Sequence, residues 1–313
     1  MKLRLSLARK VVAKLLYIAA SVAFGVVSPC IRAQTAVILC TDPAVTGPIR
    51  LAPGQVVTLW VAGLTTTLPI NGITATSTPF PTMLGGISVT MTQNGPRLPP
   101  VPIIAVHQLY GGCFAPCTKV IGVTVQIPYE LEPEDLPACG SCLDSGRIFV
   151  SDGTNTTTTL DVSAVSAQVH VLGITHADGR LVTRLNPGLV GEVIVMYASG
   201  LGFPRFPTSL SELKTGDVTP TPAPTAAGAL SYDYRFNASP SKAQITAPDP
   251  YIRFIGMSPG SVGLYQVNFA VPPPSAALTE CDEISVSSNL TVTLLGGFSS
   301  FDGAAICVKE PPQ

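Results

Sequence analysis

Four cysteines in the first half of the chain have spacings that could hold a metal ion. Cys113 and Cys117 form a C-x3-C pair, and Cys139 and Cys142 form a C-x2-C pair further along the chain. Four thiolates spaced in this way are typical of a structural zinc site in a reducing compartment. In an oxidising compartment the same cysteines form disulfides, which we favour for an exported chain. Thiol redox catalysis by Cys139 and Cys142 is disfavoured, because the neighbouring acidic residues disfavour a thiolate.

The second half contains two cysteines, Cys281 and Cys307, and we expect them to form a disulfide. The bridge would close a long loop and contribute about 3 kcal/mol, mainly by restricting the unfolded chain. In the first half, the strand expected at residues 120–128 would hold Cys117 and Cys139 apart, which favours pairing within each of the two close pairs. Seven cysteines follow residue 33, so this pairing would leave Cys40 as the odd thiol.

Acidic residues gather in the unusual segment at residues 129–146. They are Glu130, Glu132, Glu134, Asp135 and Asp144. Loops on a rigid sandwich often carry binding, and carboxylates suit calcium, but the spacing is not that of an EF-hand. Backbone carbonyls or waters would therefore have to complete a calcium site. The alternatives are a patch that binds a basic partner and a loop whose charges only keep it solvated.

Two further motifs are expected to be structural. The sequence GMSPG at residues 256–260 fits the nucleophile-elbow pattern, but Pro259 has no N–H for an oxyanion hole and a strand-like run follows. We therefore expect a turn there. His170, His176 and Asp178 are close in sequence, yet their surroundings have the composition of a strand and an ordinary turn, which disfavours a metal site.

A repeat suggests the elements that hold these residues. Residues 54–64 align without gaps with residues 191–201, at an offset of 137. In each copy a glycine precedes a β-branched run that ends on Gly-Leu, which predicts a strand between two turns. Residues 123–128 match residues 267–272 at an offset of 144, so the duplication extends beyond one strand. A period as long as this indicates duplicated domains rather than a solenoid.

Composition favours an all-β fold for both repeats. Apolar residues make up 46% of the 313 residues and charged residues only 12%, with 28 Gly and 30 Pro. Low charge, many turn-forming residues and runs of Val, Thr and Ile fit β-sandwiches better than helical or α/β folds. Helix should be scarce, because no sustained helical period is found beyond residue 33. Trp60 and Tyr197, which coincide in the repeat, are expected in the cores of the two sandwiches.

Residues 1–33 have the pattern of a secretory signal peptide. Five basic residues precede the apolar run at residues 15–27, and Ala33 offers a small residue for cleavage. The run is too short to span a bilayer comfortably, so we expect cleavage rather than a retained membrane anchor. Cleavage leaves 12 basic and 19 acidic residues. This charge disfavours a nucleic-acid or anionic-lipid partner.

Several motifs together resemble a known family. They are APGQVVTLWVAGL, LGGISVTM, VTVQIPYEL, ADGRLVTRLNPGLVGEVIVMYASGLG and FIGMSPGSVGLYQVNFAVP, followed by a final Gly-Gly hairpin. This order is similar to the uncharacterised C-terminal β-domain family of secreted acidobacterial (Solibacter-type) proteins. The similarity covers nearly the whole chain after residue 50, and the cysteine-containing segments at residues 111–122 and 130–146 depart from it. The resemblance implies secretion and an immunoglobulin-like β-domain, here in two divergent copies, and it implies no activity.

These patterns predict an all-β chain with two tandem immunoglobulin-like β-sandwich domains after a signal peptide. The expected ranges are 1–33 for the signal peptide, 34–173 for a first domain with cysteine-rich insertions, and 174–313 for the second domain. We expect a secreted or cell-envelope binding or adhesion module that is not an enzyme, needs no cofactor and has an extracellular protein or a polysaccharide as its partner. The alternative is a zinc-binding or thiol-redox protein that uses the four cysteines between residues 113 and 142, and calcium is a further candidate ion. The ligand and the oligomeric state stay open.

Overall fold

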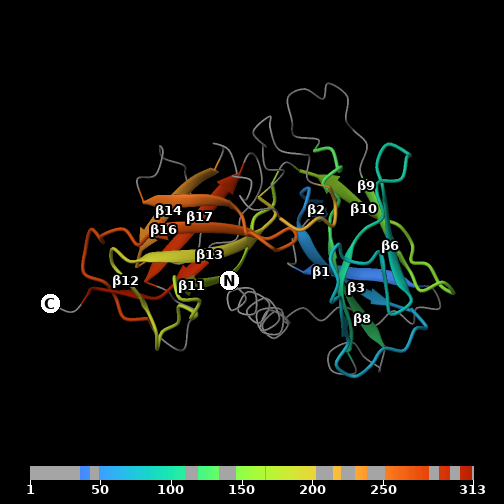
Figure 1. Cartoon of the computed structure of the whole chain (residues 1–313), viewed down its shortest axis with the longest axis horizontal. Coiled ribbons are helices and arrows are strands. Elements are labelled where there is room, and N and C mark those ends of the chain that lie inside the picture. Colours follow the sequence, from blue (N-terminus) through green and yellow to red (C-terminus); the bar gives the residue numbers. More distant parts are fainter. Residues whose placement is uncertain are drawn as a thin grey trace. The chain divides into compact units, whose positions relative to one another are not determined.

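The computed structural model describes ten stretches of the chain, whose contacts define two compact units (Figure 1). The described residues are 36–42, 49–109, 119–133, 146–165, 167–201, 214–219, 230–237, 251–281, 289–296 and 304–311. These stretches contain 19 strands and no helix, in agreement with the all-β prediction. In the same stretches there is accordingly no helix that is long and apolar enough to cross a membrane. The expected signal peptide lies outside the described residues.

The first domain contains two five-stranded sheets. It extends to Ala167 and, among the described residues, also includes residues 214–219, which come from much later in the sequence. One sheet is antiparallel throughout and has the order β1 (Val37–Asp42), β3 (Val56–Ala62), β8 (Val120–Gln126), β7 (Ile103–Leu109) and β4 (Ile73–Thr74). The other has the order β2 (Ile49–Leu51), β10 (Leu160–Ala164), β9 (Gly146–Ser151), β6 (Ile87–Thr92) and β5 (Met83–Leu84). In this sheet β2 pairs with β10 in parallel, and the other pairs are antiparallel.

The core of the first domain lies between these two sheets. Val57, Leu59 and Val61 of β3 are buried in it, and Ile148 and Val150 of β9 join the same apolar cluster from the other sheet. Buried and more exposed residues alternate along β6 and β9. This alternation is what a strand with one core face and one open face requires.

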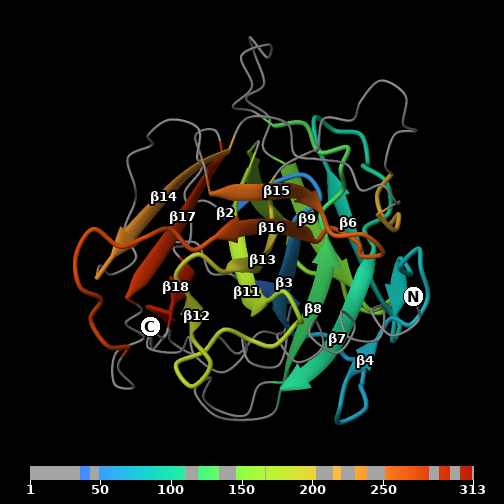
Figure 2. The ribbon, with the colours of Figure 1, turned by 60° about the vertical axis from the view of Figure 1, so that its left-hand side comes forward.

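The second domain repeats this arrangement with fewer strands. Its first sheet has the order β11 (His170–His176), β13 (Val193–Ser199), β16 (Tyr265–Ala270) and β15 (Ile252–Met257), and Figure 2 shows these strands side by side. A second sheet contains β14 (Leu230–Phe236), β17 (Leu290–Gly296) and β18 (Ala304–Ile306). The short strands β12 (Gly188–Leu189) and β19 (Val308–Lys309) pair in parallel.

Both domains have the strand order of an immunoglobulin-like sandwich. In such a sandwich strands A, B, E and D form one sheet, and strands C, F and G form the other. In the first domain these positions are taken by β1, β3, β8 and β7 and by β6, β9 and β10. In the second domain they are taken by β11, β13, β16 and β15 and by β14, β17 and β18. The prediction of two immunoglobulin-like β-sandwiches is confirmed by this order.

The B and E strands keep the same register in the two domains. Trp60 lies opposite Gly122 in the first domain, and Tyr197 lies opposite Gln266 in the second. These pairs are related by the same offsets, 137 and 144, that relate the repeated sequences. The sequence repeat is therefore also a repeat of strand pairing.

The repeated glycines bound the B strand because the chain turns there through left-handed conformations. Gly54 and Gly191 precede the strand with φ of 72° and 82°. Gly63 and Gly200 follow it with φ of 85° and 74°. Side chains with a Cβ rarely adopt such angles, which explains why glycine stands at all four positions.

Two details differ from the expectations. The contacts divide the domains after Ala167, because β11 pairs along its length with β13, and a boundary after residue 173 would cut β11. The aromatic residues lie on the outer faces of their sheets, because Leu59 and Val61 on either side of Trp60 fill the core. Trp60 is buried nevertheless, but Tyr197 is partly exposed, so its expected place in the core is wrong.

Candidate functional site

A face of the second domain combines aromatic and amide side chains. Tyr197 of β13 lies opposite Gln266 of β16, and Asn268, two residues further along β16, lies opposite Phe254 of β15. Residues opposite one another in a ladder point to the same face of the sheet. Because Met196, next to Tyr197, is fully buried in the core, these four side chains lie on the outer face. We call the surface formed by Tyr197, Phe254, Gln266 and Asn268 the amide–aromatic face.

The polar atoms of this face are only partly used. Gln266 Nε2 donates a hydrogen bond of 2.9 Å to Asn268 Oδ1. Within the described residues, Gln266 Oε1, Asn268 Nδ2 and the Tyr197 hydroxyl have no hydrogen-bond partner, and all four residues are partly exposed. Burial raises the pKa of Tyr197, so the hydroxyl stays neutral. The face therefore offers neutral donors and acceptors beside two aromatic rings.

Two glycines lie beside these side chains in the sheet. Gly173 of β11 lies opposite Tyr197, and Gly256 of β15 lies opposite Gln266. A row of four residues therefore crosses all four strands of the sheet, in the order Gly173, Tyr197, Gln266 and Gly256. The two ends of the row carry no side chain, and the Tyr197 ring and the Gln266 amide between them are partly exposed.

The equivalent face of the first domain is closed. Trp60 takes the place of Tyr197 and meets the ring of His107 edge-on, with 5.0 Å between the centroids. Trp60 is 7% exposed and Gln126, on the same face, is fully buried. Gly122 makes room for both rings, since a Cβ there would lie 2.5 Å from His107 and 2.9 Å from Trp60. Burial lowers the pKa of His107, which keeps this face neutral as well.

Residues 214–219 bind to the end of β8 on this closed face. The Gly216 N–H donates a hydrogen bond of 2.9 Å to Gln126 Oε1. Thr215 Oγ1 accepts a hydrogen bond of 2.8 Å from the Tyr129 N–H and donates one to the carboxylate of the next residue, Glu130. The segment thus occupies the acceptor of Gln126 and the N–H of Tyr129.

The acidic segment is described only in part. Glu134, Asp135 and Asp144 lie outside the described residues. Glu130 is held by Thr215, and the main chain of Glu132 exchanges two hydrogen bonds with the Gln93 side chain, of 2.9 and 2.7 Å. In the part of the chain that the structure describes, no three His, Cys, Asp or Glu side chains gather as a metal site would require. The calcium site stays a prediction.

Sequence reasoning did not foresee the role of Asp152, which joins two loops of the first domain. Its Oδ2 accepts hydrogen bonds from Thr65 N–H (2.5 Å), Thr65 Oγ1 (2.8 Å) and Thr66 N–H (3.1 Å), and its Oδ1 accepts from Thr154 and Asn155 N–H (3.0 and 2.7 Å). Desolvation raises the pKa of Asp152, but these bonds outweigh it and hold the pKa well below the ordinary value. Both carboxylate oxygens are occupied, so Asp152 fixes the loops. The sequence indicates only that Asp152 and Gly153 form a pair typical of a hairpin turn.

The serine motif is a turn, as the sequence predicts. Ser258 follows β15, is 7% exposed and donates its N–H to Leu264 O at 2.8 Å. Strand β16 begins at Tyr265, so the chain continues as a strand where a nucleophile elbow needs a helix.

The three residues considered as a histidine metal site do not converge. His176 Nδ1 lies 2.7 Å from Glu192 Oε1, and its Nε2 lies 3.2 Å from Asn186 O. Asp178 instead forms an ion pair of 2.6 Å with its exposed neighbour Arg180. His170 lies at the other end of β11.

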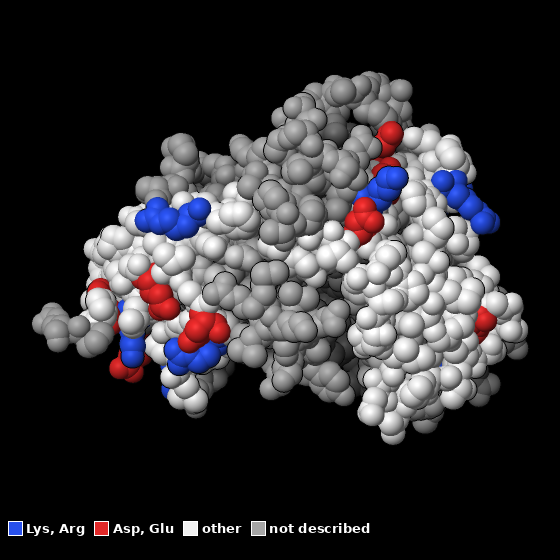
Figure 3. All heavy atoms as spheres, in the orientation of Figure 1, with Lys and Arg blue, Asp and Glu red and all other residues white. Residues whose placement is uncertain are grey.

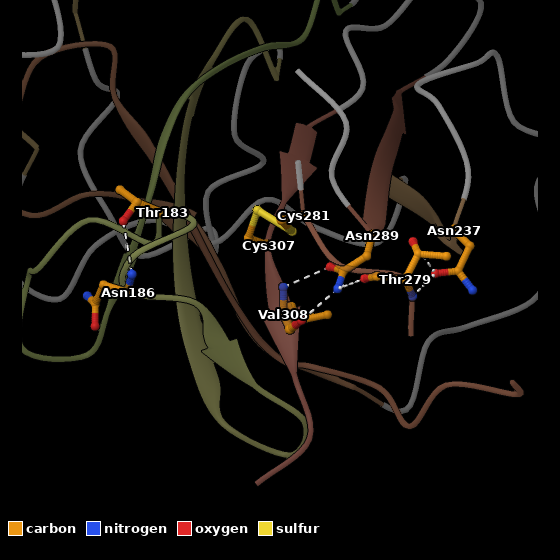
Figure 4. Close-up of a disulfide and its surroundings, with 8 residues drawn as sticks. All are labelled: Thr183, Asn186, Asn237, Thr279, Cys281, Asn289, Cys307 and Val308. Carbon is orange, nitrogen blue, oxygen red and sulfur yellow. Dashed lines mark hydrogen bonds between the residues drawn. A yellow bond between two sulfur atoms is a disulfide. The ribbon is translucent and has the colours of Figure 1, made fainter. Parts of the chain in front are cut away.

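Cys281 and Cys307 form a disulfide, the pairing that the sequence predicts (Figure 4). The other expected disulfide or zinc ligands lie outside the described residues: Cys113, Cys117, Cys139 and Cys142. The same holds for the side chain of Cys40. Their pairing stays a prediction.

The three glycosylation sequons begin with asparagines that hold the structure together. Asn289, beside the disulfide, is 2% exposed and its amide donates to Thr279 O and Val308 O at 2.9 and 2.7 Å (Figure 4). The Asn237 amide donates to a backbone carbonyl at 3.0 Å, and the Asn155 amide does so at 3.1 Å. Of the three, only the Asn289 amide is buried with both of its N–H groups donated, so a glycan there would disrupt the fold.

Comparisons with known proteins do not identify a family or a function for this chain. No family model matches the chain, and the search of curated proteins gave no significant match. Among solved structures, the chain is similar to bovine butyrophilin, with 6% identity over 88% of this chain and 98% of that one and a TM-score of 0.21. It is also similar to the tandem Ig repeats of Dlar, with 8% identity over 85% and 97% and a TM-score of 0.17. Scores this low carry no argument, and the fold class rests on the strand order.

Proposed function

We propose that the chain is an exported, non-enzymatic binding module that holds its partner on the amide–aromatic face of the second domain. The observation that carries the proposal is the contrast between equivalent faces. In the first domain Trp60 and Gln126 are buried and the Gln126 acceptor is occupied by Gly216, whereas Tyr197 and Gln266 of the second domain are partly exposed and have polar atoms without a partner among the described residues. A rigid sheet that presents unpaired donors beside aromatic rings is suited to binding.

Three features support export. The Cys281–Cys307 disulfide is of a kind that persists in oxidising compartments. Residues 1–33 have the composition of a cleavable leader, and the repeated motifs resemble a family of secreted proteins. Recognition by charge is disfavoured for a different reason: only 12% of the residues are charged, and charged side chains are sparse among the described residues on the face that Figure 3 shows.

The test is the binding of labelled mature protein to the envelope and matrix fractions of the producing cells. A Tyr197→Ala/Gln266→Ala variant should lose most of its binding, because it removes one ring and one amide from the face. Phe149→Ala is the matched control, since Phe149 is a partly exposed aromatic residue opposite Thr90 on an outer face of the first domain. If the double variant melts like the parent protein and still binds as well, the proposal is wrong.

A further inference from the structure

Resting on the proposed function, we infer that the amide–aromatic face binds a neutral polysaccharide. Sugar rings present C–H groups on their faces and hydroxyl groups around their edges. The faces pack on aromatic rings, and the hydroxyls exchange hydrogen bonds with side-chain amides, which donate and accept. Tyr197 and Phe254 supply the rings, and Gln266 and Asn268 supply the amides between them.

The spacing of the two rings fits a short run of sugars. Tyr197 and Phe254 are two strands apart and are displaced by two residues along the strands. With ordinary strand spacing and rise, this places them about 12 Å apart along a diagonal of the sheet. That is roughly the span of a disaccharide, so a glycan crossing the strands diagonally would meet one ring, then the amides, then the other ring.

The free polar atoms point to hydroxyl groups as their partners. Gln266 and Asn268 share one hydrogen bond, which fixes the two amides relative to each other and leaves Gln266 Oε1 as an acceptor and Asn268 Nδ2 as a donor. The Tyr197 hydroxyl adds a group that can do both. A sugar hydroxyl also both donates and accepts, so it satisfies each of these atoms without burying a charge.

Charge and size favour a neutral glycan over the other candidates. None of the four side chains of the face is charged, and neither are Gly173 and Gly256 beside them. A uronate or sulfate group would therefore find no cation among them. A stable protein partner needs about 800 Å² on each side and roughly 20 to 30 residues. Two rings about 12 Å apart with two amides between them suit a narrow chain better.

Affinity electrophoresis of the mature protein tests the inference directly. The gels contain one polymer each: dextran, laminarin, galactomannan and xylan as neutral polysaccharides, and alginate and hyaluronan as acidic ones. At least one neutral polymer should retard the parent protein, and the acidic polymers should not. Tyr197→Ala should weaken this retardation roughly tenfold or more, as truncation of a central aromatic anchor does elsewhere.

Two further variants separate stacking from folding defects. Tyr197→Phe keeps the ring and should keep most of the affinity, while Phe149→Ala should migrate like the parent protein on every gel. Retardation that Tyr197→Ala leaves unchanged, retardation by acidic polymers alone, or no retardation by any neutral polymer would each overturn the polysaccharide inference. The envelope-fraction assay judges the proposed function separately, because a protein partner lost in Tyr197→Ala/Gln266→Ala would leave that function standing.

Discussion

At the scale of single residues, Gly122 decides how the outer face of β8 packs. It lies directly opposite Trp60 on β3, and the ring of His107 from β7 reaches over it. A glycine inside a strand lacks a side chain to pack and normally weakens the strand. Here its missing Cβ is the space into which two aromatic rings fit.

Gly122→Ala should therefore destabilise the first domain by about 1 to 3 kcal/mol, the usual range for overpacking. Its Cβ would lie 2.5 Å from the imidazole and 2.9 Å from the indole, so both rings would have to shift. Gly188→Ala is the control, because the nearest atoms to a Cβ there are 3.7 Å away and its backbone angle is ordinary. Urea unfolding of both variants measures the difference. Equal midpoints for Gly122→Ala and the parent protein would show that the rings can move apart.

Asp152 makes the first domain sensitive to acid. Its folded pKa lies below the ordinary value of 3.8, because hydrogen bonds from Asn155, Thr65 and Thr154 favour the ionised form over the opposing effect of desolvation. A depressed folded pKa means that the unfolded chain binds the proton more readily. The stabilisation is therefore fully present above pH 3.8 and is lost as the pH falls from there towards the folded pKa.

Asp152→Asn should remove this part of the pH dependence. At neutral pH the variant should lose about 1 to 2 kcal/mol, since one amide oxygen cannot replace two carboxylate oxygens that accept five hydrogen bonds. Below pH 3.8 the two unfolding free energies should converge. Asp161→Asn is the control, because Asp161 is exposed and, among the residues that the structure describes, pairs only with Arg147, at 3.2 Å. A constant gap between variant and parent down to the lowest pH would contradict the argument.

At the scale of elements, the sequence predicts the B strands and the turns that bound them, but not which of their faces is covered. The repeated glycines and β-branched runs identify both strands because backbone angles and strand propensity are local properties. The burial of Trp60 and the exposure of Tyr197 depend on distant segments, so alternation along the strand could not distinguish them. Pairing of residues 214–219 with Gln126 is a contact across 90 positions that no local pattern encodes.

The amide–aromatic face was missed for a related reason. Phe254 and Asn268 meet because β15 pairs with β16, and the bulge between residues 252 and 254 sets which side chains share the face. A shift of one residue would send these side chains to the core. The disulfide, in contrast, could be predicted. Cys281 and Cys307 are the only two cysteines in the second half of the sequence, so only one pairing within that half is possible.

The disulfide should stabilise the second domain by about 3 kcal/mol, since it closes a separation of 26 residues in the unfolded chain. Replacing both cysteines with serine should lower the unfolding free energy by that amount while leaving binding by the amide–aromatic face intact. Unfolding of the first domain, followed by its own tryptophan fluorescence, is the internal control because Trp60 is the only tryptophan. A loss below about 0.5 kcal/mol would mean that the unfolded chain is already restricted without the bridge.

At the scale of the whole molecule, the duplication extends to individual hydrogen bonds. In the first domain Ala52 N–H bonds to Gln55 Oε1 at 2.9 Å, and in the second Leu189 N–H bonds to Glu192 Oε2 at the same distance. The Glu192 carboxylate also reaches His176, which has no counterpart in the first copy. The two copies thus share their scaffold and differ in what each adds to it. In the same way, the two domains share the sheet but differ on its outer face: Trp60 is buried in the first domain, and Tyr197 is partly exposed in the second.

The molecule cannot be divided into its two domains by a single cut, and this leads to the last prediction. A fragment of residues 34–167 lacks residues 214–219, which hydrogen-bond to the fully buried Gln126 and to the backbone of Tyr129. Without the Gly216 N–H, Gln126 Oε1 loses its partner, which costs about 1 to 3 kcal/mol. The fragment should therefore unfold at a lower urea concentration than the same domain in the intact chain, as reported in both by Trp60 fluorescence. In the intact chain, Thr215→Val should reproduce part of the loss and Thr76→Val, at an exposed position of the first domain, should not. Identical midpoints for the fragment and the intact chain would mean that the first domain does not need residues 214–219, which belong to the connection between β13 and β14, for its stability.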